Sequence, residues 1–527
     1  MQNTPKIRRF HRLTSLAMAA VLLLSLAACG SSTSSTPNSS GGSQMSKPGS
    51  SNASIPGTES DTSAGPESNP SSEGGNGSSM AETSSNGGGT SSNGGGGTTS
   101  SGGSGGFTPP TYDLSGKTIN IWTPSGAPKK NTLEYASWKY VEEKYKCTIK
   151  FTKVSYEVCV NKMSAAAISG KADCDIWEAA WYDTYPSFIG KSMATPLNKY
   201  YPFDQDPNWK SDENWNLNTW NGNLYGLNYG AEPPRWGMWY NKALLRQAGA
   251  EDPATLVKQN KWTWEKFLEI CQKVTKTTSS GVEQWGYYDE YLSVTCILTN
   301  GGEIIGRDSS GNYKFNLNSE KAKKGMNFAL DLLNKYKVVP HVGSVGDPIL
   351  LDMFKQGNVA FTTYAPEYGP EAVAKGIKAS DLGYTYPPKG PDATDYVIHA
   401  ATYSPVYVVP PQLDETWKKQ VICVLQDMLC VWDSSKPFAV KKADILDIGF
   451  SKSEYKGIYE NNKDFMLNGG KKNKVAYLNS FKLFDMLNEN LIYPLFKGET
   501  TMESALSKVT PMAQSRIDEY VALTKGK

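Results

Sequence analysis

Residues 220–242, with the sequence WNGNLYGLNYGAEPPRWGMWYNK, concentrate the side chains best suited to contact a ligand. The stretch holds three Trp and three Tyr, but only one acid, Glu232, and one Arg, Arg235. Its Gly residues interrupt any helical period, and Pro233 and Pro234 fix φ and remove two backbone donors. We therefore predict an extended segment at residues 232–234, flanked by rigid aromatic rings that form a recognition surface.

The sequence contains few residues suited to nucleophilic catalysis or metal binding. The chain has three His, one of them at position 11, so neither a His-based zinc site nor a Ser-His-Asp triad is expected. The sequence GGSGG at 102–106 matches a hydrolase nucleophile elbow, but no strand or helix pattern flanks it. The eight Cys include no C-x-x-C spacing, and we expect free thiols after Cys29. We predict no catalytic residue, no metal and no cofactor.

The N-terminus has the pattern of a secretory signal. Basic residues at 6–12 precede an apolar run at 16–28, which is too short to span a bilayer. The sequence LAAC at 26–29 resembles a bacterial lipobox, in which the Cys receives a diacylglycerol and becomes the new N-terminus. We expect a lipid anchor on Cys29 at the extracytoplasmic face of a bacterial membrane, with a plain signal peptide as the alternative.

A long polar segment separates this signal from the rest of the chain. Residues 30–106 are almost entirely Ser, Gly, Thr, Asn and Pro, so they have little apolar surface to bury and are expected to be disordered. A flexible coil of this length spans roughly 50 Å on average. The remaining part of about 420 residues exceeds one hydrophobic core and predicts two lobes. The formal net charge of +2 gives no reason to expect nucleic acid as a partner.

The hydrophobic pattern after residue 110 alternates between strands and helices. We predict strands at 117–122, 147–154 and 173–179, separated by helices, and hence a parallel α/β sheet. Ligands of such sheets bind beyond the carboxyl ends of the strands, where Trp122, Trp181 and Tyr182 lie. Further along, Thr263 is expected to cap a helix, residues 301–315 to form a hairpin, and residues 417–432 and 502–521 to form helices.

Read in order, the chain resembles family 1 of the extracellular solute-binding proteins of ABC transporters, the group that includes maltose-binding protein. The matching segments are ISGKAD at 168–173, ATPLN at 194–198, NGNLYGL at 221–227, YNK at 240–242, TWEKF at 263–267, FKQGNVAF at 354–361, PPKGP at 387–391 and SAL at 504–506. Asn228 stands where the family usually has Pro, and Tyr368 follows Ala-Pro-Glu where members often have Gly-Pro-Trp.

The resemblance implies a two-lobed α/β fold, each lobe a sheet flanked by helices, joined by a hinge. Residues 1–28 would be the signal peptide and 29–110 the lipidated tether. The first lobe would take 111–230 and 400–440, and the second 231–399 and 441–527. The implied function is non-enzymatic capture of a sugar, expected to be an oligosaccharide, by a monomeric protein that hands it to the permease subunits of a transporter.

A sugar presents apolar C–H faces and a rim of hydroxyls, so we expect aromatic rings, carboxylates and an Arg in the site. Nine of the 14 Trp lie between Trp177 and Trp264, near the expected cleft. The predicted ligand-binding residues are Trp122, Trp181, Tyr182, Asp183, Glu232, Arg235, Trp236, Trp239, Tyr364, Glu367, Tyr368 and Tyr403.

Some of these residues have structural alternatives. Trp239 could belong to the core because it precedes Tyr240 in an apolar strand, and Glu232 could simply pair with Arg235. Two other functions also stay open. A surface glycoside hydrolase would use two acids such as Asp183 and Glu367, and a peptide or amino-acid receptor would need Arg235 as a charge partner.

Overall fold

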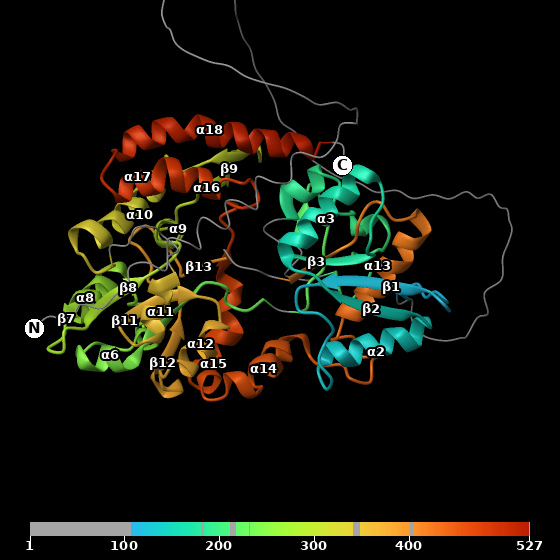
Figure 1. The fold of residues 1–527 in the computed structure, drawn as a ribbon, viewed down its shortest axis with the longest axis horizontal. Coiled ribbons are helices and arrows are strands. Elements are labelled where there is room, and N and C mark those ends of the chain that lie inside the picture. The colour runs from blue at the N-terminus through green and yellow to red at the C-terminus, as the bar shows by residue number, and fades with distance from the viewer. Residues whose placement is uncertain are drawn as a thin grey trace, which may run out of the picture. The chain divides into compact units, whose positions relative to one another are not determined.

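The computed structural model describes residues 107–180, 184–210, 218–230, 232–340, 348–400 and 405–525. The predicted signal peptide, Cys29 and most of the tether lie outside these residues. The described part contains two main β-sheets (Figure 1). One buried apolar cluster belongs to each sheet, and a third, larger cluster contains residues of both. None of the described helices combines the length and the hydrophobicity that crossing a membrane requires.

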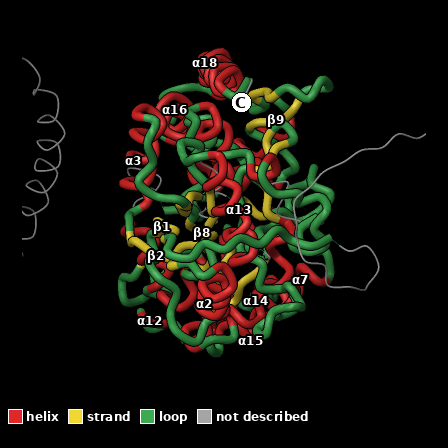
Figure 2. The backbone as a smooth tube through the Cα atoms, turned by 90° about the vertical axis from the view of Figure 1, so that its right-hand side faces the viewer, coloured by secondary structure: helices red, strands yellow, loops and turns green. Residues whose placement is uncertain are grey.

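The first sheet has the strand order β14-β3-β1-β2. Its strands are β1 (Thr118–Thr123), β2 (Thr148–Lys153), β3 (Ile176–Ala180) and β14 (Pro405–Val408). β1 pairs in parallel with β2 and β3, and β1 and β2 lie side by side in both views (Figure 1, Figure 2). The three predicted strands and the parallel pairing are confirmed. β14, which follows more than 200 residues later in the chain, joins the edge of this sheet antiparallel to β3.

Helices cover the first sheet and connect its strands. α2 (Leu133–Tyr145) links β1 to β2, and α3 (Tyr156–Ser169) links β2 to β3 and ends at Gly170, which has a positive φ of 73°. The helix α13 (Glu415–Leu429) follows β14 and packs on α2, where the Ser137 hydroxyl donates to the carbonyl of Met428. The chain after residue 405 therefore returns to the first sheet.

The second sheet has the order β12-β6-β11-β8-β7. Its strands are β6 (Gly237–Asn241), β7 (Lys276–Thr277), β8 (Glu283–Tyr288), β11 (Val359–Tyr364) and β12 (Leu382–Thr385). β6 lies between β11 and β12 and is antiparallel to both, whereas β11 and β8 are parallel. Thr263 caps α8 (Trp264–Val274) by accepting from the Lys266 amide, and the apolar face of this helix is buried, as predicted.

Shorter elements complete the described chain. The predicted hairpin at 301–315 is present as β9 (Ile305–Arg307) and β10 (Tyr313–Phe315), which pair antiparallel. The remaining strands are β4 (Thr219–Trp220), β5 (Asn223–Leu224), β13 (Ile398–His399) and β15 (Asn473–Lys474). The remaining helices are α6 (Lys242–Gln247), α7 (Pro253–Lys258), α9 (Leu292–Thr299), α10 (Glu320–Leu330), α11 (Pro348–Lys355), α12 (Tyr368–Ala374), α14 (Ile445–Phe450), α15 (Ile458–Asn468), α16 (Phe484–Leu487), α17 (Tyr493–Phe496) and α18 (Met502–Leu523).

The segment 232–234 leads from the first sheet to the second. Before it, Leu227 bridges to Tyr407 beside β14, and the Asn228 amide donates to the carbonyl of Pro405 at 2.8 Å. After it, Asn473 holds the chain from both sides, donating to the Pro233 carbonyl and accepting from the Arg235 amide. Gly470 approaches the carbonyl of Glu232 so closely that a Cβ at this position would lie 1.7 Å from that oxygen. The segment is neither helix nor strand, which agrees with the predicted crossing segment.

Candidate ligand-binding site

Two adjoining cavities lie where the crossing segment leaves the first sheet. The first cavity encloses about 370 Å³ and the second about 310 Å³. Both are lined by Glu134, Tyr229 and Pro405, so these residues mark their junction. We call the two together the double cavity.

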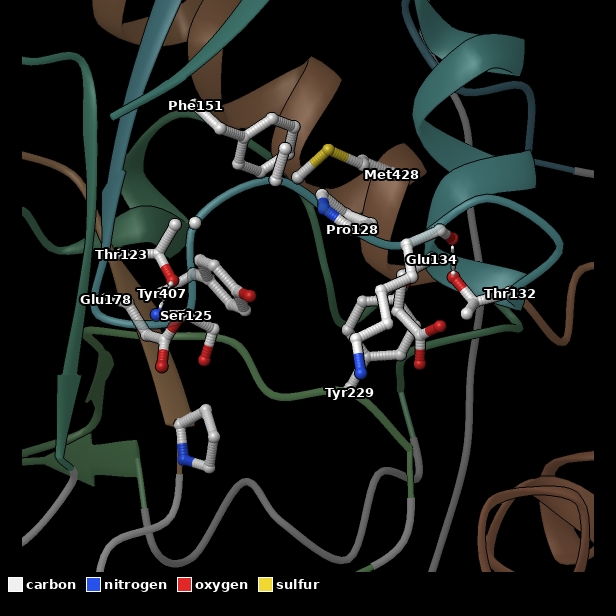
Figure 3. A pocket seen from close by; sticks show the side chains of 14 residues that line it. Thr123, Ser125, Pro128, Thr132, Glu134, Phe151, Glu178, Tyr229, Tyr407 and Met428 are labelled. Carbon is white, nitrogen blue, oxygen red and sulfur yellow. Dashed lines mark hydrogen bonds between the residues drawn. The ribbon is translucent and has the colours of Figure 1, made fainter. Parts of the chain in front are cut away.

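The first cavity lies at the carboxyl end of β1 (Figure 3). Thr123 ends β1, the loop from Ser125 to Lys129 follows, and Thr132 caps α2 by accepting from the Tyr135 amide at 3.1 Å. This is the edge at which open parallel sheets bind their ligands. Glu134 in the first turn of α2 also lines this cavity, and a carboxylate at this end of a helix is stabilised by the helix dipole.

Apolar and aromatic side chains form much of the first cavity. Phe151 and Met428 line it together with the rings of Tyr229 and Tyr407. Tyr407 in β14 stands opposite the buried Glu178 in β3, and Figure 3 shows both beside Ser125. Burial raises the pKa of the Tyr407 hydroxyl, and the nearby Glu178 carboxylate raises that pKa further, so Tyr407 keeps its proton and can donate a hydrogen bond.

The second cavity joins elements of both sheets. Asn228, Tyr229 and Pro405 line it from the side of the first sheet. The residues that line it from the second sheet and from the chain after α13 include Arg235, Glu367, Phe450 and Tyr455. Phe450 and Tyr455 contact each other edge to face, with 5.2 Å between ring centroids. A ligand in this cavity would therefore touch chain segments that belong to both sheets.

Glu232 and Arg235 form a buried ion pair at the second cavity. Both Nε and Nη2 of Arg235 lie 2.9 Å from Oε2 of Glu232, and the Asn228 amide donates to Oε1 at 3.3 Å. Only 8% of the Arg235 side chain and 10% of the Glu232 side chain are exposed. The alternative that these two residues pair with each other is thus confirmed, and the pair is far more enclosed than the surface pair we expected.

The structure places three of the predicted ligand contacts in the core. Trp236, Trp239 and Tyr368 are at most 1% exposed and belong to the apolar core of the second sheet. Trp239 stacks on Tyr384 at 4.0 Å and donates to the Ala365 carbonyl, because β6 is a central strand with both neighbours in place. Trp236 donates to Asp289 at 3.2 Å. The core alternative for Trp239 is therefore the one the structure supports.

The other predicted residues lie in different settings. Glu367 is exposed and lines the second cavity with Glu232 and Arg235. Tyr364 is half-buried between Trp236 and Tyr368, with centroid distances of 4.6 and 5.0 Å. Trp122 is 7% exposed, lies under the Lys162 ammonium and lines neither cavity. The predicted contacts Trp181, Tyr182, Asp183 and Tyr403 lie outside the described residues.

The sequence reasoning missed several residues of the double cavity. Glu134 lies in the first turn of α2, the helix that follows β1 after a loop, so the rule that placed Trp122 near a ligand also applied to this part of the chain. Tyr229 was part of the aromatic stretch but was not selected. Phe450 and Tyr455 gave no local signal, because only the tertiary fold brings α14 and the turn after it to the crossing segment. Among the described residues, no group of three His, Cys, Asp or Glu could hold a metal.

Comparison with known proteins agrees with this architecture. Residues 123–410 match the model of a protein family described as "Bacterial extracellular solute-binding protein". Three similar crystal structures are a Thermotoga lettingae solute-binding protein of an ABC transporter bound with α-D-tagatose, the GacH receptor of Streptomyces glaucescens, solved unliganded and with acarbose, and a Listeria monocytogenes substrate-binding protein in complex with cycloalternan.

The similarity covers nearly the whole of each of these proteins. The Thermotoga structure is 17% identical with a TM-score of 0.54 and covers 76% of this chain and 100% of its own. The Streptomyces receptor is 17% identical with a TM-score of 0.53 and covers 78% of this chain and 99% of its own. The Listeria protein is 15% identical with a TM-score of 0.54 and covers 78% of this chain and 100% of its own. Such similarity shows the fold, and the family match covers more than half of the chain. The protein belongs to the bacterial extracellular solute-binding protein family, whose members are receptors of ABC transporters and not enzymes.

Proposed function

We propose that the protein captures an oligosaccharide outside the cell and delivers it to the permease of an ABC transporter. The observation that supports this most directly is the double cavity, which is lined by segments of both sheets. A solute bound there contacts both parts of the fold at once, as a receptor that closes around its ligand requires.

The chemistry of the lining suits a sugar. The rings of Tyr229, Phe450 and Tyr455 can cover apolar C–H faces. The carboxylates of Glu134 and Glu367 can accept hydrogen bonds from sugar hydroxyls. Sugars are also the ligands of the three similar crystal structures. We further propose that Tyr364, Trp181, Tyr182, Asp183 and Tyr403 contribute to the same site, on the strength of the family resemblance.

The proposed mechanism is hinge closure. Residues 111–230 and 400–440 would move as one lobe, and 231–399 and 441–527 as the other, about the crossing segment 232–234. Because the ligand touches both lobes only when they are close together, it stabilises the closed state and shifts the population toward it. The lipid on Cys29 and the polar tether would hold this monomeric receptor at the outer face of the membrane, near the permease.

Two other functions receive less support. A glycoside hydrolase would need Glu367 and Asp183 on either side of one bond, and the family consists of receptors. A peptide or amino-acid receptor would need a cation for the ligand carboxylate, but Arg235 is already bound by Glu232.

A thermal-shift screen of the full chain against mono- and oligosaccharides tests the proposal. A ligand at 100 times its Kd stabilises the folded state by about 2.7 kcal/mol, which gives a clear rise in Tm. Release of reducing ends during incubation with the same glycans would contradict a receptor. Stabilisation by peptides and by no saccharide would exclude a sugar ligand.

A further inference from the structure

We infer that the double cavity selects its saccharide by charge: it accepts neutral and amine-bearing sugars and excludes sugars that carry carboxylate or phosphate groups. This inference rests on the proposed function, because it concerns the ligand of the same site. It goes further in naming a property of the ligand that neither the fold nor the family determines.

Acids outnumber bases around the double cavity. The lining contains the four acids Glu134, Glu178, Glu232 and Glu367, against the two bases Lys129 and Arg235. Glu134 and Glu367 come from elements of different sheets, and neither forms an ion pair with another described residue. An anionic ligand in the second cavity would therefore meet two carboxylates, whereas Lys129, the other base of the lining, belongs to the first cavity.

The charge of the one Arg in the second cavity is already balanced. Its Nε and Nη2 are bonded to Oε2 of Glu232, and its side chain is 8% exposed. Its other N–H donors could bond a ligand, but a ligand carboxylate there would also meet the Glu232 carboxylate, so the pair offers it no net positive charge. The surrounding backbone holds the pair in place, because Asn473 binds the Arg235 amide and Gly470 packs on the carbonyl of Glu232.

A second feature of the site favours an uncharged polar ligand. Thr123, Ser125 and Thr132 line the first cavity. Their hydroxyls can bond sugar hydroxyls or amines and offer no positive charge to an anion. Together, neutral hydroxyls and excess carboxylates favour a ligand rich in hydrogen-bond donors and free of anionic groups.

Binding of the purified full chain to three matched sets of oligosaccharides, measured by calorimetry, tests this inference. The neutral set contains malto-, cello-, xylo- and manno-oligosaccharides, the amino set chitosan oligomers, and the acidic set oligogalacturonides and alginate oligomers. We expect the tightest ligand to come from the neutral or amino set, with acidic oligomers at least about tenfold weaker. An acidic oligomer that binds as tightly as the best neutral one overturns the inference but leaves a saccharide receptor in place. No binding in any set overturns the proposed function itself.

The double variant Glu134→Gln with Glu367→Gln asks whether charge is the cause. This variant should bind acidic oligomers about tenfold more tightly than the wild type does, because each replaced carboxylate removes a like charge. The difference in affinity between neutral and acidic oligomers should therefore become smaller. Added salt should reduce the same difference in affinity in the wild-type protein, because it screens the repulsion between the carboxylates of the site and an acidic ligand. The control is Glu503→Gln, an exposed residue at the start of α18 that lines neither cavity and should leave this difference unchanged. If the double variant also leaves the difference in affinity between neutral and acidic oligomers unchanged, the site excludes acidic sugars by shape and not by charge.

Discussion

Tyr229 lies at the junction of the two cavities, and its ring is the part of the residue that a ligand can contact. The chain just before the crossing segment positions this ring, and Figure 3 shows it close to Glu134 and Thr132. The hydroxyl is shielded from solvent and lies beside Ser137. Substitutions that keep or remove the ring can therefore separate the roles of ring and hydroxyl at this position.

We expect Tyr229→Phe to leave the affinity for the saccharide nearly unchanged, because the ring stays and the hydroxyl is shielded from solvent. Tyr229→Leu should lower that affinity by roughly three- to tenfold, because it removes an aromatic ring that can cover a sugar face. Calorimetry measures both affinities, and urea unfolding checks that both variants fold. Tyr200→Phe is the matched control, since the Tyr200 hydroxyl donates to Glu415 outside the cavities. Equal losses of affinity in Tyr229→Phe and Tyr229→Leu would show that the ligand contacts the hydroxyl.

His399 is a second residue whose environment makes a measurable prediction. It lies in β13, is 2% exposed, and contacts the rings of Trp236 and Tyr291. Burial disfavours the imidazolium ion and lowers the pKa of His399 to about 3. The unfolded chain, with a pKa near 6.5, therefore binds a proton between about pH 6.5 and pH 3 that the folded protein does not bind.

The free energy of unfolding should consequently fall as the pH drops below about 6.5, by up to ~1.4 kcal/mol per pH unit from His399 alone. His399→Leu lacks the titrating group, so its free energy of unfolding should not contain this pH-dependent contribution. The stability advantage of the wild type over the variant should therefore shrink as the solution is acidified. Urea unfolding at pH 7, 6 and 5 measures it. Parallel stability curves for the two proteins would mean that His399 is protonated in the folded state.

Among the elements, α13 depends on a buried charge cluster at its carboxyl end. Asp427 accepts from Lys144 of α2 at 2.7 Å and lies 2.9 Å from Nζ of Lys436, whose side chain is fully buried. Lys436 also donates to the carbonyl of Cys430. Burial by itself would raise the pKa of Asp427, but Lys436 and Lys144 outweigh burial and lower this pKa. The cluster fixes α13 against α2 and the turn that follows α13.

We expect Asp427→Asn to lower the free energy of unfolding by about 3–5 kcal/mol, because it leaves Lys436 charged and buried without its counter-ion. The matched control is Asp113→Asn, which breaks the pair with Lys146 at 2.7 Å, where both side chains are more than half exposed. That change should lower the free energy of unfolding far less, because solvent screens an exposed pair. Urea unfolding measures both variants. Equal decreases in the free energy of unfolding would show that burial does not determine how much an ion pair contributes to stability.

On the scale of the whole described molecule, Trp220 joins segments far apart in the chain. Its ring stacks on Tyr313 of β10 at 5.0 Å, and its Nε1 donates to the Thr524 hydroxyl at 3.0 Å, just after α18. Trp220 comes from β4, next to the segment that pairs with Tyr407 of the first sheet. It is 4% exposed, so the contact is largely free of water. Trp220 thus joins the β4–β5 pair to the β9–β10 pair and to the chain after α18.

A graded series tests this connection. Trp220→Phe keeps a ring for stacking and should cost about 1 kcal/mol or slightly more for the lost hydrogen bond. Trp220→Ala removes the stack as well and should cost about 3–5 kcal/mol. Chemical unfolding gives both values. Equal and small losses would mean that β4 can leave α18 and β10 without consequence for the rest of the fold.

The sequence by itself determined the local structure and the fold class. Periodicity and turn residues predicted the strands of the first sheet, the hairpin at 301–315 and the capped helix at 264–274, because these depend on residues near one another in the chain. Pro233 and Pro234 marked the crossing segment for the same reason. The order of motifs then indicated the family.

Only the tertiary structure decided which side chains meet at the site. An aromatic-rich stretch cannot show that β6 lies between two strands, and this central position places Trp239 in the core. Nor can it show that Glu232 and Arg235 satisfy each other, or that Glu134 and Glu367 line one cavity from different sheets. Burial and long-range pairing depend on how the two sheets and their helices pack, and no local pattern contains that information.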